Sequence, residues 1–290
     1  MNSICAVIVT YNPDCTLIEN VAAVVSQVSS IVVVDNGSTG DSVQILEELE
    51  KFKTVEIVYN GENLGIAVAL NIGVRRANTL NVEWVATFDQ DSTVPDHYFS
   101  TMLGMLEKLP FKNKVAIVAP QYRDKATKLL ASFSKSYAGT DYFEVDTVIT
   151  SGNLVKVSAL YNIGGFDETF FIDAVDHDFC LRLRLRGYRI IISCSTELAH
   201  SIGIMERHHL FGKVFKVSNH SPLRRYYNAR NRVVVYRRYL RNFPGWVCRD
   251  VVNWTREVGG IILFESDPCA KLTSAFKGIL DGITGRMGKI

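Results

Sequence analysis

Residues 84–92 read WVATFDQDS, an apolar run that ends in two carboxylates one residue apart. Side chains of a β-strand alternate between its two sides, so Asp89 and Asp91 converge on one point at the carboxyl end of this predicted strand. Two like charges held that close favour a bound cation, and oxygen ligands suit Mg²⁺ or Mn²⁺. The alternative is a solvated, Asp-rich turn after an edge strand.

The residues around this stretch alternate between strand and helix patterns. Continuous β-branched runs, typical of buried parallel strands, are expected at 4–9, 31–34, 55–58, 84–88 and 115–118. Helical patterns lie between them at about 16–28, 42–52 and 64–79, the last with Asn63 as its expected N-cap. Strands joined by helices at this spacing predict an α/β fold with a doubly wound, mostly parallel sheet.

Polar residues follow four consecutive strands of this predicted sheet. The four loops begin with Thr10-Tyr11-Asn12, Asp35-Asn36-Gly37-Ser38, Asn60-Gly61-Glu62-Asn63 and Asp89-Gln90-Asp91. Ligands of doubly wound sheets bind beyond the carboxyl ends of the strands. The sequence therefore predicts a pocket at this edge.

The second half of the chain has a mixed pattern. A strand is expected at 142–150, a helix at 179–186, a strand at 189–193 and a basic amphipathic helix at 224–242. No flexible linker marks a boundary. We expect an α/β domain that carries the predicted pocket over 1–204 and a basic helical extension over 205–290.

Bulk composition is that of a globular protein, with 47% hydrophobic and 21% charged residues among 290. A strand pattern begins almost at the amino end, so we expect no signal peptide, and no apolar run reaches the ~18–20 residues that span a bilayer. The six cysteines are scattered, which indicates reduced thiols of a cytoplasmic protein rather than disulfides or a zinc site.

Charge is segregated along the chain. Residues 207–249 contain eleven Lys or Arg and no Asp or Glu, and the rest of the chain holds 21 basic and 30 acidic residues. Such a block indicates an anionic partner: a nucleic acid, an acidic membrane surface or a diphosphate.

Two common nucleotide motifs are absent from the sequence. There is no G-x-G-x-x-G of dinucleotide oxidoreductases and no G-x-x-x-x-G-K-[ST] of P-loop NTPases. A diphosphate in the predicted pocket would be neutralised by a divalent ion and by arginine. Asp35 is placed to accept a hydrogen bond from a base N–H, although a turn-forming role before Asn36-Gly37 is the alternative.

These residues resemble the family 2 inverting glycosyltransferases of GT-A fold over roughly 3–240, closest to bacterial rhamnosyltransferases of surface polysaccharide. The matching stretches are VIVTYNP at 7–13, VDNGS at 34–38, NGENLGIA at 60–67 with ALN at 69–71, FDQDS at 88–92, SGN at 151–153, GGFDE at 164–168, FIDAVDHDFCLR at 171–182 and RYYNARN at 225–231. Their order and spacing carry the resemblance, since each stretch alone is weak.

The resemblance implies a metal-dependent transfer from a nucleotide sugar, with dTDP-L-rhamnose as the donor. It makes Asp89 and Asp91 a D-x-D site for Mg²⁺ or Mn²⁺ and His200 a third metal ligand or pyrophosphate contact. Donor-binding positions are then Thr10, Tyr11, Asn12, Asp35, Ser38, Asn63, Gly65, Asp89 and Gln90.

Inverting transfer needs a carboxylate base to activate the acceptor hydroxyl. Many relatives carry Glu-Asp where this chain has Val175-Asp176, and the second acid is the base, which places it at Asp176. Asp178 and Asp173 are the alternatives, although Asp178 can instead cap the following helix. The missing Glu is a departure from the family pattern.

The basic block has two interpretations in this resemblance. Arg225 and Arg230 could reach the diphosphate, whereas Arg232, Arg237, Arg238 and Arg241 are expected on a solvated or lipid-facing surface. Implied acceptors are glycans on a lipid carrier at the cytoplasmic face of the inner membrane, and the apolar residues 258–264 suit peripheral docking there.

Three other functions compete with this one. The first is a glycosyltransferase that uses a UDP- or GDP-sugar. The second is a sugar nucleotidyltransferase, which would be expected to carry a Gly-rich basic loop after the first strand, where this chain has Tyr-Asn-Pro-Asp at 11–14. The third is a nucleic-acid-binding module built on residues 207–249, which leaves Asp89, Asp91 and Asp176 without a role. We therefore expect an enzyme with no nucleic-acid partner.

Overall fold

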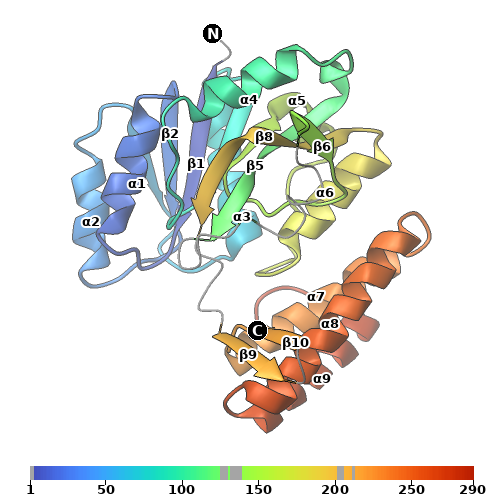
Figure 1. Ribbon diagram of the computed structural model, residues 1–290. Coiled ribbons are helices and arrows are strands. Elements are labelled where there is room, and N and C mark those ends of the chain that lie inside the picture. Colours follow the sequence, from blue (N-terminus) through green and yellow to red (C-terminus); the bar gives the residue numbers. More distant parts are fainter. Residues whose placement is uncertain (1–2, 125–129, 131–138, 201–205, 211–212) are drawn as a thin grey trace. The chain divides into compact units, whose positions relative to one another are not determined.

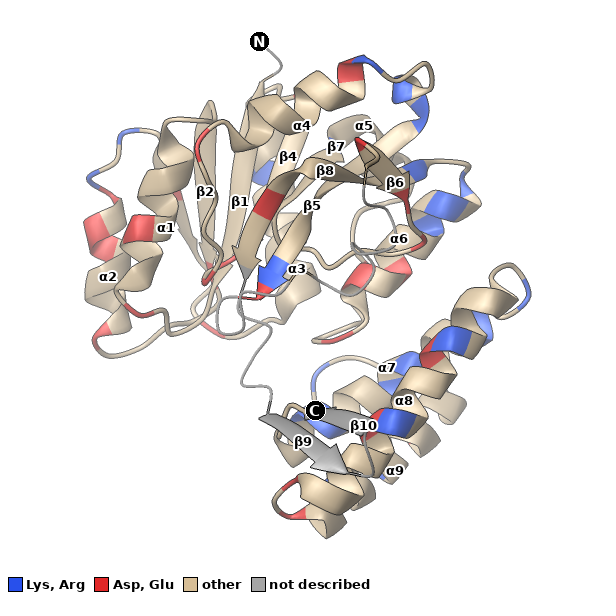
Figure 2. Ribbon diagram, in the orientation of Figure 1, with Lys and Arg blue, Asp and Glu red and all other residues tan. Residues whose placement is uncertain are grey.

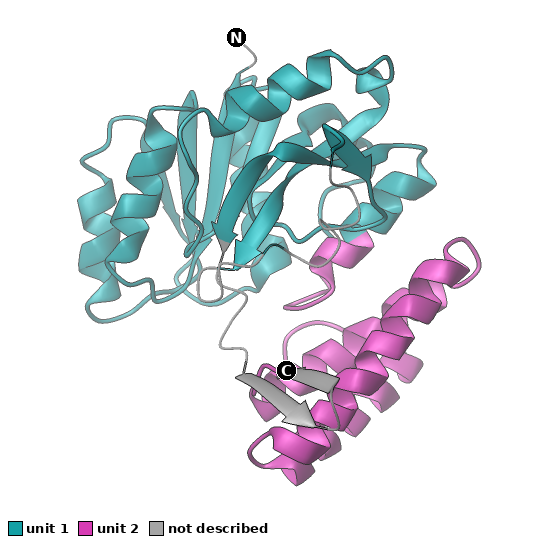
Figure 3. Cartoon of the chain, in the orientation of Figure 1, with its two compact units in different colours: residues 1–168, 179–201 teal, residues 169–178, 202–290 magenta. Residues whose placement is uncertain are grey.

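A computed structural model describes residues 3–124, 130, 139–200, 206–210 and 213–290; for residues 200, 206–210 and 213–216 only the backbone is described. The chain forms two compact units (Figure 3). The sheet unit comprises residues 1–168 and 179–201, and the helical unit comprises residues 169–178 and 202–290. The second unit thus includes a ten-residue segment that lies before the predicted boundary at 204.

The sheet unit is built on an eight-stranded sheet of order β3-β2-β1-β4-β7-β5-β8-β6 (Figure 1). The pairs among β1 to β4 are parallel, as is β5 with β8, whereas β7 and β6 are antiparallel to their neighbours. The strands are β1 (Ile4–Thr10), β2 (Ser30–Asp35), β3 (Val55–Tyr59), β4 (Trp84–Asp89), β5 (Val115–Asp124), β6 (Tyr142–Glu144), β7 (Asn153–Lys156) and β8 (Arg189–His200).

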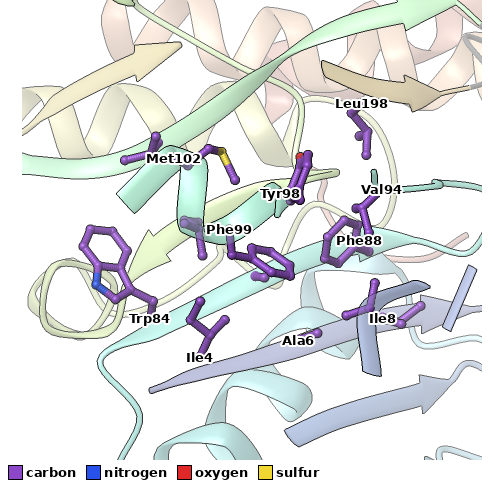
Figure 4. Packing of buried hydrophobic residues seen from close by; sticks show 14 of the residues in the cluster. Ile4, Ala6, Ile8, Trp84, Phe88, Val94, Tyr98, Phe99, Met102 and Leu198 are labelled. Carbon is purple, nitrogen blue, oxygen red and sulfur yellow. The ribbon is translucent and has the colours of Figure 1, made fainter. Parts of the chain in front are cut away.

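Helices cover both faces of this sheet. Ile4, Ala6 and Ile8 of β1 face the main apolar cluster, in which Tyr98, Phe99 and Met102 of one helix pack on Trp84 and Phe88 of β4 (Figure 4). Val7, on the opposite side of β1, lies against Gly73, where an added Cβ would come within 2.3 Å of its side chain. The helices of the unit are α1 (Thr16–Val25), α2 (Ser42–Leu49), α3 (Ile66–Asn78), α4 (Tyr98–Glu107), α5 (Val157–Asn162) and most of α6 (Val175–Leu185), with a 3₁₀ turn at Lys112–Lys114.

The predicted α/β class and mostly parallel sheet are confirmed, and three local predictions are wrong. Helix α3 begins at Ile66 with Gly65 as its N-cap, because the Asn63 side chain accepts from the Gly65 N–H at 3.0 Å instead of capping the helix directly. The expected strand at 142–150 is limited to the three residues of β6, and β7 follows it unpredicted. Helix α6 begins four residues before the expected position 179 and so includes Asp176 and Asp178.

Beyond the segment 169–178, the described part of the helical unit contains an antiparallel pair of strands followed by three helices. The elements are β9 (Glu206–Leu210), β10 (Lys213–Val217), α7 (Pro222–Tyr239), α8 (Pro244–Phe264) and α9 (Pro268–Thr284). Ser221 caps α7, its hydroxyl accepting from the Arg224 N–H at 3.3 Å, and Pro222 occupies the first turn, where the lack of an N–H does no harm. Helices α7 and α9 pack closely at Gly278. A Cβ added at this glycine would lie only 2.2 Å from the Tyr226 carbonyl oxygen.

Candidate active site

The register of the parallel strands brings the predicted loops to one edge. Thr10 pairs with Asp35 and Asp35 with Tyr59, while Val9 pairs with Asp89. The last residues of β1 to β4 therefore lie at nearly the same level. This common edge is where ligands bind in doubly wound sheets.

Asp35 organises the loop after β2. Its Oδ1 accepts from the Thr10 hydroxyl at 3.1 Å and from the Ser38 hydroxyl. Its Oδ2 accepts from the N–H groups of Gly37 at 3.1 Å and Ser38 at 2.9 Å. The carboxylate is buried and already accepts four hydrogen bonds, which gives it the turn-forming role. An additional contact with a base would have to share one of these oxygens.

The loop after β1 rests on the same turn. Asn12 has a positive φ of 47°, its N–H donates to the Ser38 hydroxyl at 2.8 Å, and its side chain accepts from the Thr39 N–H at 3.0 Å. Tyr11 is half exposed and donates through its N–H to Gln90 Oε1 at 2.8 Å. Gln90 thus connects the first loop to the loop that follows β4.

Buried Asn36 joins the second loop to the third. Its Oδ1 accepts from Asn60 at 3.0 Å and from the Leu64 N–H at 3.2 Å, and its Nδ2 donates to Asn63 at 3.2 Å and to the Gly65 carbonyl at 3.3 Å. Sequence reasoning noted Asn36 only as part of a motif. Its role depends on partners about 25 residues away, which no local pattern reveals.

Ser151 positions the Asp89-Gln90-Asp91 turn. The Asp89 N–H donates to the Ser151 hydroxyl at 3.0 Å, and that hydroxyl also lies 2.6 Å from the Ser92 hydroxyl. Asn20 adds a further bond, from its Nδ2 to the Gln90 carbonyl at 2.9 Å. Ser151 belongs to the SGN motif at 151–153, to which the sequence analysis assigned no role. Asn20 was not predicted as a site residue.

The chemistry of this turn fits a hard divalent cation. Asp89 and Asp91 are both partly exposed, and the Asp89 backbone is held by the buried Ser151 hydroxyl. Among the side chains that the structure describes, no cluster of three or more His, Cys, Asp or Glu forms a complete cage for an ion. Two carboxylates leave most coordination positions of a divalent ion open. Mg²⁺ often fills such positions with phosphate oxygens and water. His200 ends β8, and its side chain lies outside the described residues.

The three candidate bases Asp173, Asp176 and Asp178 form an acid cluster in the helical unit, where α7 holds it. Asp173 and Ala174 both have positive φ, 64° and 62°. Buried Asn231 donates to the carbonyls of Ile172 at 2.7 Å and Asp173 at 2.9 Å, which fixes this strained pair just before α6. Asp176 follows in the first turn, is partly exposed, and accepts from the His177 N–H at 2.8 Å.

The two alternative bases have different surroundings. Burial raises the pKa of Asp173, the neighbouring Asp176 adds to the rise, and Arg224, 3.3 Å away, opposes it. Asp178 is fully buried and accepts from Tyr239 at 2.6 Å and Arg238 at 2.8 Å. Asp178 lies within α6 rather than at its cap, and its enclosed carboxylate ties this helix to α7.

Arg225 and Arg230, which were expected to contact a diphosphate, are buried and bonded within the helical unit. Arg225 forms a buried ion pair with Glu265, which also pairs with Lys271 at 3.1 Å. Arg230 is fully buried and donates to the Gly288 carbonyl at 2.7 Å. Both guanidinium groups are committed to partners far along the chain.

Two arginines expected on the surface are also engaged. Arg232 is buried and pairs with Asp250 at 3.2 Å and Glu257 at 2.6 Å. Arg238 is exposed on one side but holds Asp178. Part of the basic block thus neutralises acids within its own unit.

Comparison with known proteins agrees with this geometry. Residues 5–164, more than half of the chain, match the family Glycosyl transferase family 2. The chain is 29% identical over 310 residues to the dTDP-rhamnosyl transferase RfbF of Shigella flexneri, covering 99% of this chain and 98% of that protein. It is 26% identical over 196 residues to the poly-beta-1,6-N-acetyl-D-glucosamine synthase of Staphylococcus aureus, covering 62% of this chain and 45% of that protein.

Solved structures share the fold at low sequence identity. The mannosyltransferase PcManGT from Pyrobaculum calidifontis, in complex with GDP-Man and Mn²⁺, superposes with a TM-score of 0.61 and 17% identity over 98% of this chain and 87% of that one. GalNAc-T7 with UDP, GalNAc and Mn²⁺ has a TM-score of 0.63 and 14% identity over 85% of this chain and 50% of that one. The chain accordingly belongs to glycosyl transferase family 2 and is a glycosyltransferase of GT-A fold.

Proposed function

We propose that this glycosyltransferase moves L-rhamnose from dTDP-L-rhamnose to a hydroxyl of a lipid-linked glycan, with inversion at the anomeric carbon. The observation that carries the proposal is the strand register, which gathers four polar loops and the Asp89–Asp91 turn at one sheet edge. Similarity over nearly the whole length to a dTDP-rhamnosyl transferase favours this donor.

The proposed donor site uses the residues of that edge. The loops after β1 and β2, shaped by Asp35, would hold the base and ribose, and Tyr11 offers an exposed ring beside them. Asn63 and Gly65 border the site through the network of Asn36. Asp89 and Asp91 would hold Mg²⁺ or Mn²⁺, which when bound offsets the negative charge that develops on the departing diphosphate.

The proposed general base is Asp176. The acceptor oxygen forms a bond to the anomeric carbon while the bond from that carbon to the diphosphate oxygen breaks, and the acceptor proton passes to the Asp176 carboxylate. Asp176 suits this role better than its neighbours, because Asp178 is enclosed and Asp173 is largely shielded beside Arg224. Asn231 would act as a positioning residue, since it fixes the backbone that precedes Asp176.

The acceptor proposal places the enzyme at a membrane. A glycan on a lipid carrier is presented at the cytoplasmic face of the inner membrane, so we propose peripheral association there during synthesis of surface polysaccharide such as O-antigen. Among the helices that the structure describes, none is both long and apolar enough to cross a bilayer.

A different donor is the second candidate. The solved neighbours carry UDP or GDP-Man, which makes a UDP- or GDP-sugar the specific competitor. The nucleic-acid-binding alternative loses support, because Arg225, Arg230 and Arg232 point into the helical unit rather than toward a polyanion outside it.

A panel of thermal-shift measurements tests donor and metal together. The protein is melted with dTDP-, UDP- and GDP-sugars, each with Mg²⁺, Mn²⁺ or EDTA. We expect stabilisation by dTDP-L-rhamnose that disappears with EDTA and in Asp91→Asn. The matched control Glu47→Gln, which changes an exposed acid of α2, should behave as wild type. Stabilisation by GDP-mannose alone would contradict the proposed donor. Stabilisation that survives EDTA would contradict the proposed role of a divalent metal in donor binding.

A further inference from the structure

Helix α8 turns an apolar face outward. Val251, Val252, Ile262 and Leu263 recur at helical spacing on one side, together with Cys248 and Thr255. Ile262 and Leu263 are 55% and 54% exposed. Arg249 and Arg256 flank this side, and no acidic residue lies within it.

The two acids of α8, Asp250 and Glu257, lie on the opposite side of the helix, where the Asp250 side chain is 13% and the Glu257 side chain 42% exposed. Asp250 accepts from the Tyr236 hydroxyl at 2.6 Å and pairs with Arg232, which also pairs with Glu257. The inner side of α8 also buries Trp246, Val247 and Ile261, so this helix presents apolar side chains both to the interior and to its outer surface. An exposed apolar face in addition to a buried one indicates an interaction surface.

Helix α9 also turns an apolar face outward. Phe276, Leu280 and Ile283 share one side and are 61%, 47% and 56% exposed. The opposite side carries Gly278 and Gly282, which let α9 approach the backbone of α7. The large apolar side chains of α9 thus remain outside the packing that holds the helix in place.

Exposed charge in this part of the molecule is predominantly positive. Residues 222–290 are all described, and their exposed acidic side chains are Asp267 and Glu257, the latter 42% exposed and paired with Arg232. The exposed bases are Arg224, Arg237, Arg238, Arg241, Arg249, Arg256, Lys277, Arg286 and Lys289. Figure 2 shows several of these basic positions on α7 and α8. The remaining acids are partly or fully buried and bonded internally, as Glu265 is to Arg225 and Asp281 to Tyr226.

We propose that the outward faces of α8 and α9 dock on an anionic lipid bilayer. The apolar side chains enter the boundary between headgroups and acyl chains, and the surrounding bases contact lipid phosphates. A second copy of the chain fits this surface less well, because it would bring the same nine exposed bases against their equivalents. This inference concerns the surface of the helical unit and holds whichever nucleotide sugar is the donor.

Vesicle binding by the full-length protein tests the inference. Flotation is measured with vesicles of phosphatidylcholine alone and of phosphatidylcholine with phosphatidylglycerol. We expect binding to the anionic vesicles only, weakened by added salt. The triple variant Phe276→Ser, Leu280→Ser, Ile283→Ser should bind tenfold less or weaker. Its matched control, Leu80→Ser with Leu185→Ser, removes exposed apolar side chains of the sheet unit and should bind as wild type.

A spectroscopic reporter separates insertion from mere charge attraction. In Phe276→Trp, the added indole should shift its emission to the blue on anionic vesicles and be quenched by brominated acyl chains. No vesicle binding by the wild type, or equal binding by the triple variant, would overturn the proposal. Conversion of a dimer to a monomer by the triple variant, seen by light scattering, would assign the surface to a second copy instead. Donor-induced thermal stabilisation, measured on the same proteins, should be unchanged, so failure of docking and failure of the donor assignment remain distinguishable.

Discussion

For the single residue Asp35, the sequence predicted the position but not the hydrogen bonds. Its position at the end of a strand predicted its place at the site edge, and the strand register agrees. Its bonding could not be predicted, because the four donors to its carboxylate come from a fold that brings residue 10 beside residue 35. The same holds for Asn231, whose contacts with residues 172 and 173 span almost sixty positions.

Removing the charge of Asp176 should separate donor binding from transfer. We expect Asp176→Asn to keep the thermal stabilisation by donor and metal but to lose transfer by a factor of ~10²–10⁴, the usual contribution of a general base. Initial rates of sugar transfer measure this loss, with Asp267→Asn as the control for an exposed acid of the helical unit. Turnover near the wild-type rate would remove Asp176 from the mechanism.

His220 should make stability depend on pH. Its pKa is lowered from 6.5 to about 4 by burial and by Arg224 and Arg225, against a smaller opposing effect of Glu265 and Glu257. Between these pH values the unfolded chain binds a proton that the folded protein does not, so stability falls as the pH drops through this window.

Replacing His220 tests this expectation. His220→Gln should reduce the loss of unfolding free energy between pH 7 and pH 4.5 by about 2 kcal/mol, because each shifted pKa unit corresponds to 1.36 kcal/mol and the side chain is only partly buried. Urea denaturation at both pH values gives the comparison. Equal losses in the variant and the wild type would contradict it.

Among the strands and helices, the pattern of buried residues determined which elements could be predicted from the sequence. Strands β1, β2 and β4 are continuous apolar runs, and their predicted ends lie within one residue of those observed. Strand β7 has only four residues, too few for a periodic signal. Helix α9 escaped prediction because its inward side is built of glycine and a buried lysine, while its apolar residues face outward.

Two glycines of the helical unit should respond in opposite ways to alanine. Gly278→Ala places a Cβ against the Tyr226 carbonyl and should destabilise the protein by about 1–3 kcal/mol, as overpacking does. Gly259→Ala in α8 meets nothing within 4 Å and should stabilise the protein by up to about 1 kcal/mol through helix propensity. Chemical denaturation measures both, and equal effects would contradict the close crossing of α7 and α9.

For the whole molecule, the block of basic residues at 207–249 could be recognised in the sequence, but the partners of these residues could not. Eleven basic residues within a stretch of 43 predicted an external anionic partner. In the structure, Arg225, Arg230 and Arg232 bind partners within the helical unit that lie 18 to 58 residues further along the chain. Long-range pairing of this kind leaves no local trace, so the sequence overstated the basic surface of α7.

The interleaving of the two units predicts the behaviour of a shortened chain. A fragment of residues 1–204 keeps the sheet edge but lacks Asn231, Arg238 and Tyr239, which hold residues 172–178. We expect it to retain stabilisation by donor and metal, to transfer no sugar, and to exchange the amide hydrogens of 169–178 faster than the full chain does. The amides of β1 serve as the internal control, and transfer at the full-length rate would show that the helical unit is dispensable.

The exposed thiols have a practical consequence for handling the protein. Cys15 is exposed just after the first loop, and Cys248 and Cys269 are exposed in the opening turns of α8 and α9. Maleimide dyes or nitroxide spin labels can therefore be attached near both surfaces of interest without engineering any cysteine. Air oxidation can also cross-link two molecules through the same thiols, so preparations for hydrodynamic measurement call for a reductant.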